Sequence, residues 1–252
     1  MPIAYLSRLT ARFRTRETNL HIGVVLTVVA GALNAGGFLA IGQYTSHMTG
    51  MVSTFADQIV LRNFALAAVA LASWLAFVAG AAATAILVNY QRRYGVTNIY
   101  AAPLLIEAML ILVFGSFGGT LERHELGDVS LAVITLCLTM GLQNALITKI
   151  SRAEIRTTHV TGLTTDLGIE LGKLLYWNRK RAKGDKESAD TRIPVTANRR
   201  KLRVHAILIA SFVCGGVAGA LGFKHLGFVS AVPLALALTM IALAPAFHKD
   251  GD

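Results

Sequence analysis

The chain has 252 residues, of which 54% are hydrophobic and only 15% are charged, with a mean hydropathy of +0.56 and a formal net charge of +10. This composition is too apolar for a soluble domain of this length, so it disfavours a soluble enzyme, a small secreted domain and a disordered chain. The positive charge could indicate a nucleic-acid partner, but its distribution along the chain favours membrane orientation instead.

Six apolar stretches are long enough to cross a bilayer as helices. A hydrocarbon core of about 30 Å requires roughly 20 helical residues, because a helix satisfies its own backbone groups in lipid. In chain order, the stretches are 21–42, 64–90, 99–117, 129–148, 204–223 and 227–247. The first follows four arginines but is longer than the apolar part of a signal peptide, so we interpret it as a signal anchor.

Two further apolar segments, 47–61 and 160–176, are shorter. Their length fits surface helices or re-entrant half-helices better than full crossings. Segment 178–203 is rich in charged residues and is predicted to be a flexible cytoplasmic loop. We favour a role in orientation for this loop over a specific partner or an anionic-lipid site.

The orientation follows from the lysines and arginines, which are in excess in short cytoplasmic loops. With six crossings and the amino terminus inside, all but three of the 24 lie on the inner side, the exceptions being Arg62, Arg123 and Lys224. Counting 47–61 and 160–176 as crossings would move Arg92 and Arg93 outside. Both termini are therefore predicted to be cytoplasmic.

An internal repeat is visible in two pairs of signatures. Residues 31–35, GALNA, match 141–145, GLQNA, and residues 45–50, TSHMTG, match 157–162, TTHVTG. Asn34 and Asn144 are 110 positions apart, and His47 and His159 are 112 apart. Two signatures in the same order, each placed similarly relative to a predicted span, favour duplication over coincidence.

Each repeat then contains three crossings, and an odd number places the second copy upside down in the membrane. The predicted fold is an all-α integral membrane protein with six transmembrane helices in a 3+3 inverted-topology repeat, each repeat with an additional short re-entrant or interfacial helix. Inverted repeats are common in transporters, although membrane duplications without transport also exist. The predicted divisions are a basic cytoplasmic segment 1–20, a first repeat 21–118, an acidic outer loop 119–128, a second repeat 129–247 that contains the basic loop, and a tail 248–252.

The repeated motifs supply the candidate site residues. His47 and His159 are the sharpest candidates, because an ionisable side chain at membrane depth commonly marks an ion or proton path; the alternative is an interfacial or structural histidine. Thr49 with Gly50, and Thr161 with Gly162, would lie in the first turn of a short helix, where free N–H groups favour an anion, or the glycines would only allow close packing. The hydroxyl groups just before each motif could serve as N-caps.

Amide and carboxyl groups complete the candidate set. Asn34, Asn144 and Gln143 could coordinate a substrate or join helices by hydrogen bonds. Glu107 lies in the middle of a predicted span, so it is protonated, paired or exposed to a cavity, and proton coupling is its functional interpretation. Asp166 and Glu170 are predicted on a polar face opposite the apolar stripe Val160, Leu163, Leu167 and Leu171, with Lys173 as ion-pair partner of Glu170.

Other chemistry has little support in the sequence. Cys137 and Cys214 lie in apolar runs and are interpreted as core packing. Two histidines without a carboxylate or cysteine cluster are a thin ligand set, so no metal site is expected, and no cofactor either. No Walker loop, G-x-S-x-G, H-E-x-x-H or C-x-x-C motif is present, so the chain is not expected to be an enzyme. The small residues of the first and fifth spans, including the pair Gly215 and Gly219, predict close helix contacts, within the chain or between copies.

The segments GALNAGGF at 31–38, SHMTG at 46–50, and THVTG at 158–162 with DLG at 166–168 resemble the YoaK-type family of bacterial membrane proteins. The resemblance covers nearly the whole chain. It implies a bacterial inner-membrane location and the description of a predicted permease of unknown function, without a substrate. Where that family commonly has Asp-Ala and an asparagine, this chain has Asn34-Ala35 and Met51.

Two functions from different classes are compatible with these patterns. The first is a transporter or permease for an unknown small solute or ion, with its site where the two short helices converge. The second is a non-transporting scaffold or regulatory membrane protein in which the motifs pack helices. The expected partners are the lipid bilayer and, in the first case, the solute; a homo-oligomer is possible and no nucleic acid is expected.

Overall fold

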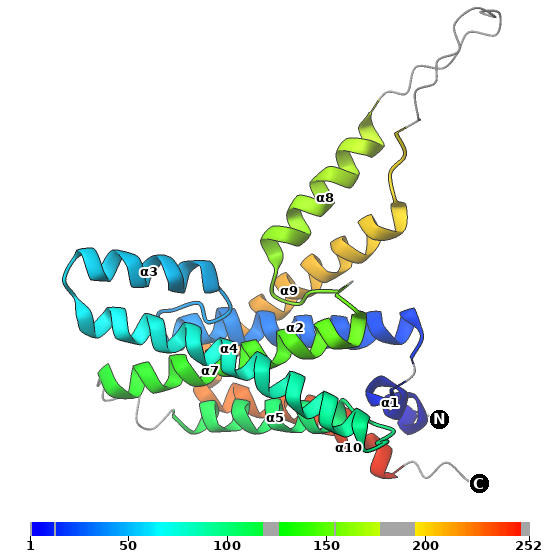
Figure 1. Ribbon diagram of the computed structural model, residues 1–252, viewed down its shortest axis with the longest axis horizontal. Coiled ribbons are helices and arrows are strands. Elements are labelled where there is room, and N and C mark those ends of the chain that lie inside the picture. The colour runs from blue at the N-terminus through cyan, green and yellow to red at the C-terminus, as the bar shows by residue number, and fades with distance from the viewer. Residues whose placement is uncertain (1, 13, 118–125, 154, 177–194, 248–252) are drawn as a thin grey trace, which may run out of the picture.

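The computed structural model of the chain describes residues 2–12, 14–117, 126–153, 155–176 and 195–247, which form helices and short connections without any strand (Figure 1). The helices are α1 (Pro2–Thr10), α2 (Arg16–Ile41), α3 (Met48–Val60), α4 (Phe64–Arg93), α5 (Ala101–Ser116), α7 (Leu126–Ser151), α8 (Val160–Leu175), α9 (Arg199–Leu226), η1 (Gly227–Ser230) and α10 (Ala231–Phe247).

Four helical stretches of the described chain are long and apolar enough to cross a membrane. They are Arg16–Ile41, Phe64–Arg93, Ser130–Ser151 and Arg199–Phe247, the last of which contains α9, η1 and α10. Helix α5 is apolar but has only 16 residues. Several long apolar helices, with large hydrophobic side chains on their outer surfaces, make the chain compatible with an integral membrane protein.

The helix ends differ from the expected ones mainly where charged residues extend a helix beyond its apolar part. Helix α2 begins at Arg16, capped by the Thr15 hydroxyl, and α9 begins at Arg199, capped by Asn198. Residues 199–203 therefore belong to α9 and not to a loop. Segments 119–125, 178–194 and 248–252 of the expected outer loop, basic loop and tail lie outside the described residues.

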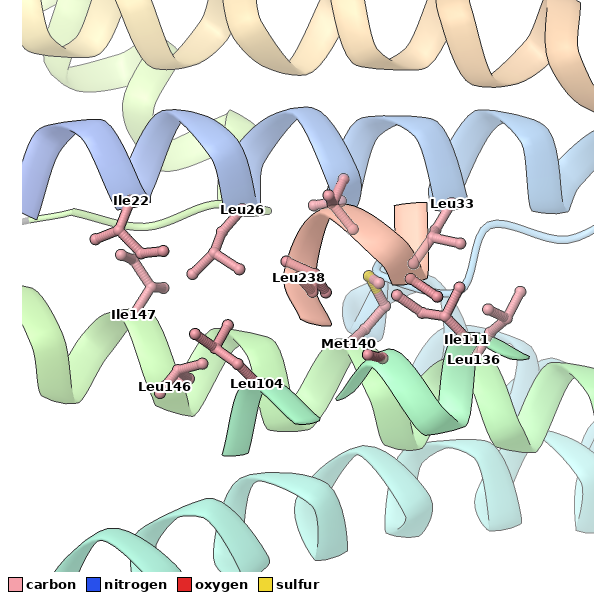
Figure 2. Close-up of a cluster of buried hydrophobic side chains, with 14 of the residues drawn as sticks. Ile22, Leu26, Leu33, Leu104, Ile111, Leu136, Met140, Leu146, Ile147 and Leu238 are labelled. Carbon is pink, nitrogen blue, oxygen red and sulfur yellow. The ribbon is translucent and has the colours of Figure 1, made fainter. Parts of the chain in front are cut away.

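The helices pack in pairs. Helix α2 lies along α9, α4 along α7, and α5 along α10, while the short helices α3 and α8 lie along α4 and α9 respectively (Figure 1). Helices α2 and α7 run antiparallel, because the Gln143 side-chain nitrogen donates to the Leu26 carbonyl while the earlier residue Leu136 lies next to the later residue Gly37. The core lies beside this antiparallel pair. Figure 2 shows apolar side chains of α2, α5, α7 and α10 meeting in this core.

Glycines mark the two closest helix crossings. A methyl group at Gly31 of α2 would overlap the carbonyl oxygen of Phe212 in α9, and one at Gly141 of α7 would overlap that of Phe77 in α4. The reciprocal approaches also occur, from Gly215 to the Val28 carbonyl and from Gly80 to the Leu138 carbonyl. Here the close contact predicted for Gly215 and Gly219 is made within the chain, against α2.

The amino-terminal segment forms a helix that the sequence analysis did not identify. Helix α1 packs against α10, and its connection to α2 pairs with the loop before α5. The Arg12 amide donates to the Thr97 carbonyl, and the Tyr100 amide donates to the Thr10 carbonyl. These bonds hold the amino terminus at the same end of the bundle as the end of α4.

Candidate functional site

The two repeated motifs fold into equivalent helix starts. His47 is the N-cap residue of α3 and His159 that of α8, and each histidine carbonyl accepts the amide of the fourth residue after it. Neither histidine side chain forms a capping bond. The expected hydroxyl caps are therefore wrong: the hydroxyl-bearing residue before each histidine has a different partner.

That partner is the asparagine of the preceding long helix. The Ser46 hydroxyl donates to Oδ1 of Asn34 at 2.8 Å, and the Thr158 hydroxyl donates to Oδ1 of Asn144 at 2.8 Å. Asn34 is seven residues before the end of α2, and Asn144 is seven before the end of α7. At about 1.5 Å per residue, each anchor draws the chain back by roughly 10 Å along the helix that it has just left. We call these two bonds the amide anchors.

Beside each amide anchor lies a completely buried threonine. Thr45 and Thr157 both have 0% exposed surface, and neither hydroxyl has a hydrogen-bond partner among the described residues. The Cys137 thiol donates to the Thr45 carbonyl at 3.4 Å. Cys137 is buried as expected, whereas Cys214 is exposed on α9 and does not pack in the core.

The first turns of α3 and α8 differ in detail. The His47 ring lies against Gly50, where a methyl group would overlap it, while the space around Gly162 is open. Both histidines, both motif threonines and Gly162 are exposed on the chain surface.

Helix α8 is held to α9 by charged side chains. Glu170, which is 3% exposed, accepts the Asn198 amide at 2.7 Å and the Lys173 ammonium at 3.0 Å, and these two bonds lower its pKa. The Lys173 pair is confirmed. The predicted polar face is wrong, because Glu170 and Leu163 are the buried residues of α8, while Leu171 is exposed. Their spacing of seven places both on one helix face.

Asp166 lines a pocket of about 800 Å³ between α8 and the first turns of α2 and α9. Its carboxylate lies 3.3 Å from the Lys201 ammonium and 4.0 Å from Nε2 of His205. Gly162 also lines this pocket. The other charged lining residues are Arg16, Glu17, Arg156, Arg200 and Arg203. Sequence reasoning did not connect Asp166 with these cations, although the dense basic run that ends at Arg203 in the first turns of α9 was a signal for them.

Glu107 and Gln143 lie apart from the motifs, inside the core. Both side chains have 0% exposed surface. The Gln143 amide nitrogen donates to the Leu26 carbonyl at 2.8 Å, but its oxygen and both oxygens of Glu107 have no partner among the described residues. Helix α5, which carries Glu107, packs against α7, which carries Gln143.

The arrangement supplies paired hydrogen-bonded loops, a buried carboxyl and a charged pocket, rather than one compact cluster. No group of three or more histidine, cysteine, aspartate or glutamate side chains that could hold a metal ion is found in the described part of the chain.

Comparisons with known proteins identify the family. A search of curated proteins and a search of solved structures each returned no match. Residues 22–244, which include both motifs, both amide anchors and Glu107, match the family described as "Protein of unknown function (DUF1275)". The YoaK-type resemblance of the sequence is consistent with this match. The chain therefore belongs to the DUF1275 family.

Proposed function

We propose that this protein is a transporter for a small solute or ion, built as six membrane crossings in a 3+3 inverted repeat, in a bacterial inner membrane with both termini cytoplasmic. Support for the repeat comes from equivalent contacts. Helix α2 crosses α9 at glycines as α7 crosses α4, and α5 pairs with its counterpart α10. Helices α5 and α10 span about 25 Å, which a tilted or locally thinned bilayer accommodates.

The observation that carries the proposal is the pair of amide anchors. Each draws a loop back along its long helix, so that α3 and α8 begin inside the length of α2 and α7 instead of beyond their ends. Discontinuous helices that begin within a membrane are typical of transporters, because their free N–H groups and helix dipoles can bind a solute. The motif histidines at these starts are then the solute-contacting or proton-carrying side chains.

Two other features fit a transport path. The pocket beside Asp166 opens at the end of the bundle that carries Arg16, Arg156 and Arg203, which is the cytoplasmic end in this orientation. Glu107 is buried without a partner among the described residues, a state that a carboxyl group at membrane depth can hold only when neutral. We infer that Glu107 carries a proton during the transport cycle. The second repeat has no counterpart carboxyl in α10, so this coupling is asymmetric.

Transport is tested by flux in proteoliposomes, with a solute chosen from ligand-dependent thermal shifts across a panel. The double variant His47→Ala/His159→Ala should lose most of the flux and keep the folded elution profile. The matched control is His225→Ala, an exposed histidine at the far end of α9, which should leave flux within about twofold. Normal flux in the double variant would exclude a role for the motif histidines.

A scaffold function is the second candidate, and one observation favours it. The motif hydrogen bonds are internal, and the glycine crossings make the bundle tightly packed. If the protein is a scaffold, no solute of the panel shifts its unfolding temperature, and the histidine substitutions lower stability or assembly instead.

A further inference from the structure

A second cleft, separate from the motif helices, lies where the connection between α1 and α2 and the first turn of α2 approach the ends of α4 and α7. It has a volume of about 1110 Å³. Six of its lining residues are cationic: Arg12, Arg14, Arg16, Arg92, Lys149 and Arg152. No carboxylate lines it within the described chain, in contrast to the pocket that contains Asp166. We call this feature the basic cleft.

Four cations of the basic cleft have no ion-pair partner in the described part of the chain. Arg16, Arg92, Lys149 and Arg152 form no ion pair with any described residue. Like charges that converge on one cleft repel each other, so an anion that bridges them stabilises the arrangement.

The Arg14 side chain is held in place in the cleft by contacts with three segments of the chain, unlike a freely moving surface arginine. Its guanidinium donates to the Leu9 carbonyl at 2.9 Å and to the Ile150 carbonyl at 3.3 Å, and it lies 4.1 Å from the ring centroid of Tyr100. Its Nε is buried and has no hydrogen-bond partner in the part of the chain that the structure describes. These contacts join α1, α7 and the start of α5, and they fix a planar guanidinium in the cleft, a group suited to bidentate contact with phosphate oxygens.

The backbone at the end of α7 is also strained beside this cleft. Arg152 and Ala153 have φ angles of +55° and +65°, a region that residues with a Cβ rarely adopt. The Ala153 amide donates to the Thr148 carbonyl at 2.9 Å and closes the helix end. Strain of this kind persists where surrounding structure demands it, and it clusters at ligand sites. Here it turns the chain at the edge of the cleft and keeps Arg152 on its lining.

We propose that the basic cleft binds a phosphate group, carried either by an anionic lipid headgroup or by a soluble phosphate compound. The inference does not require transport, because it rests on the cleft alone. Basic pockets between membrane helices at the cytoplasmic surface suit lipid phosphates, and the inner leaflet is anionic. A bound phosphate would tie the connection before α2 to the ends of α4 and α7.

The test uses the full-length protein in a neutral detergent and two probes. Radiolabelled orthophosphate binding is measured by equilibrium dialysis, and retention of phosphatidylglycerol against phosphatidylcholine is measured by native mass spectrometry. Retention of phosphatidylglycerol without orthophosphate binding assigns the site to a lipid headgroup. Orthophosphate binding that displaces the lipid assigns it to a soluble phosphate compound. Either result supports the proposal.

The variant Arg92→Gln/Lys149→Gln/Arg152→Gln should weaken binding of the active probe roughly tenfold or more. The matched control Arg8→Gln/Arg93→Gln/Arg199→Gln removes the same charge from exposed arginines outside the cleft and should stay within about twofold. If the cleft variant does not fold, Arg92→Glu alone, at an exposed position in the last turn of α4, should weaken binding about fivefold. Absence of binding by the wild-type protein, or equal losses in cleft and control variants, would overturn the proposal.

Discussion

Asn34 and Asn144 hold equivalent loops but use their amide groups differently. Asn34 acts as an acceptor: its Oδ1 receives both the amide and the hydroxyl of Ser46. Asn144 accepts from Thr158 and also donates its side-chain nitrogen to the Met140 carbonyl at 2.8 Å. An ionised carboxylate can only accept. The two anchors therefore differ in whether an aspartate can replace the asparagine.

We predict that Asn34→Asp keeps its anchor and changes the unfolding free energy by less than about 1 kcal/mol at neutral pH, whereas Asn144→Asp costs about 1–3 kcal/mol. Asn144 is only 7% exposed, so an ionised replacement would lose a donor and remain poorly solvated. The control Asn34→Leu removes the acceptor and should cost about 1–3 kcal/mol. Denaturation with a mixed-detergent titration measures these values. The interpretation is wrong if Asn34→Asp is as destabilised as Asn34→Leu.

At the scale of single helices, Glu170 is the side chain that positions α8. Its pKa is lowered by the Asn198 amide and Lys173, so the ionised form stabilises the contact with α9. A lowered folded-state pKa contributes stability that is fully present above the ordinary glutamate pKa of about 4.3. This stability is lost as the pH falls through the lowered value. Contact between α8 and α9 should therefore loosen only in acid.

Spin labels on exposed residues Thr164 of α8 and Tyr90 of α4, with Cys214 replaced by serine, can measure this loosening. The distance distribution should be narrow at neutral pH and broaden as the pH falls below about 4. Glu170→Gln keeps a hydrogen-bond acceptor but has no charge, so the distance distribution of this variant should be broad both at neutral pH and in acid. A Thr164 distance in the wild type that is independent of pH, or a narrow one in Glu170→Gln, would contradict the role of Glu170.

Helix positions were the part of the fold most accessible from the sequence. Each of the six expected apolar stretches corresponds to a helix, since apolar runs of that length have few alternatives. Helix α1 was missed because its nine residues carry no span signal. A search for apolar runs does not find charged first turns of helices such as that of α9. These turns are nevertheless helical because a cap residue, here Asn198, stabilises them.

The candidate site was only partly accessible, for a related reason. Repetition of the motifs singled out Asn34, Asn144 and the histidines, but not their partners, because the path of a loop is not encoded in periodicity. Both hydroxyl groups were assigned to caps and instead bind asparagines. The basic cleft combines residues from four segments that are distant in sequence, and only their folding brings Arg14, Arg92 and Arg152 together.

At the scale of the whole molecule, the proposed topology places the two ends of the bundle on opposite sides of the membrane. Arg62 precedes α4 and Arg92 lies in its last turn, so a helix of 30 residues, about 45 Å long, separates them. Lys224 lies near the end of α9, which is parallel to α2, and Arg8 lies in α1 before α2 begins. The inverted repeat therefore predicts one outer pair, Arg62 and Lys224, and one inner pair, Arg8 and Arg92.

Single cysteines at these four positions, with Cys214 replaced by serine and Cys137 left buried, test the topology in intact cells. A membrane-impermeant maleimide should label Arg62→Cys and Lys224→Cys directly, and Arg8→Cys and Arg92→Cys only after the membrane is opened. Each substitution removes one positive charge, and the remaining lysines and arginines keep their strong excess on the inner side. The orientation of the protein in the membrane should therefore persist. Labelling of Arg62→Cys and Arg92→Cys from the same side would mean that α4 does not cross the bilayer. The second copy would then not be inverted relative to the first, and the helix starts at His47 and His159 could not face each other from opposite sides of the membrane.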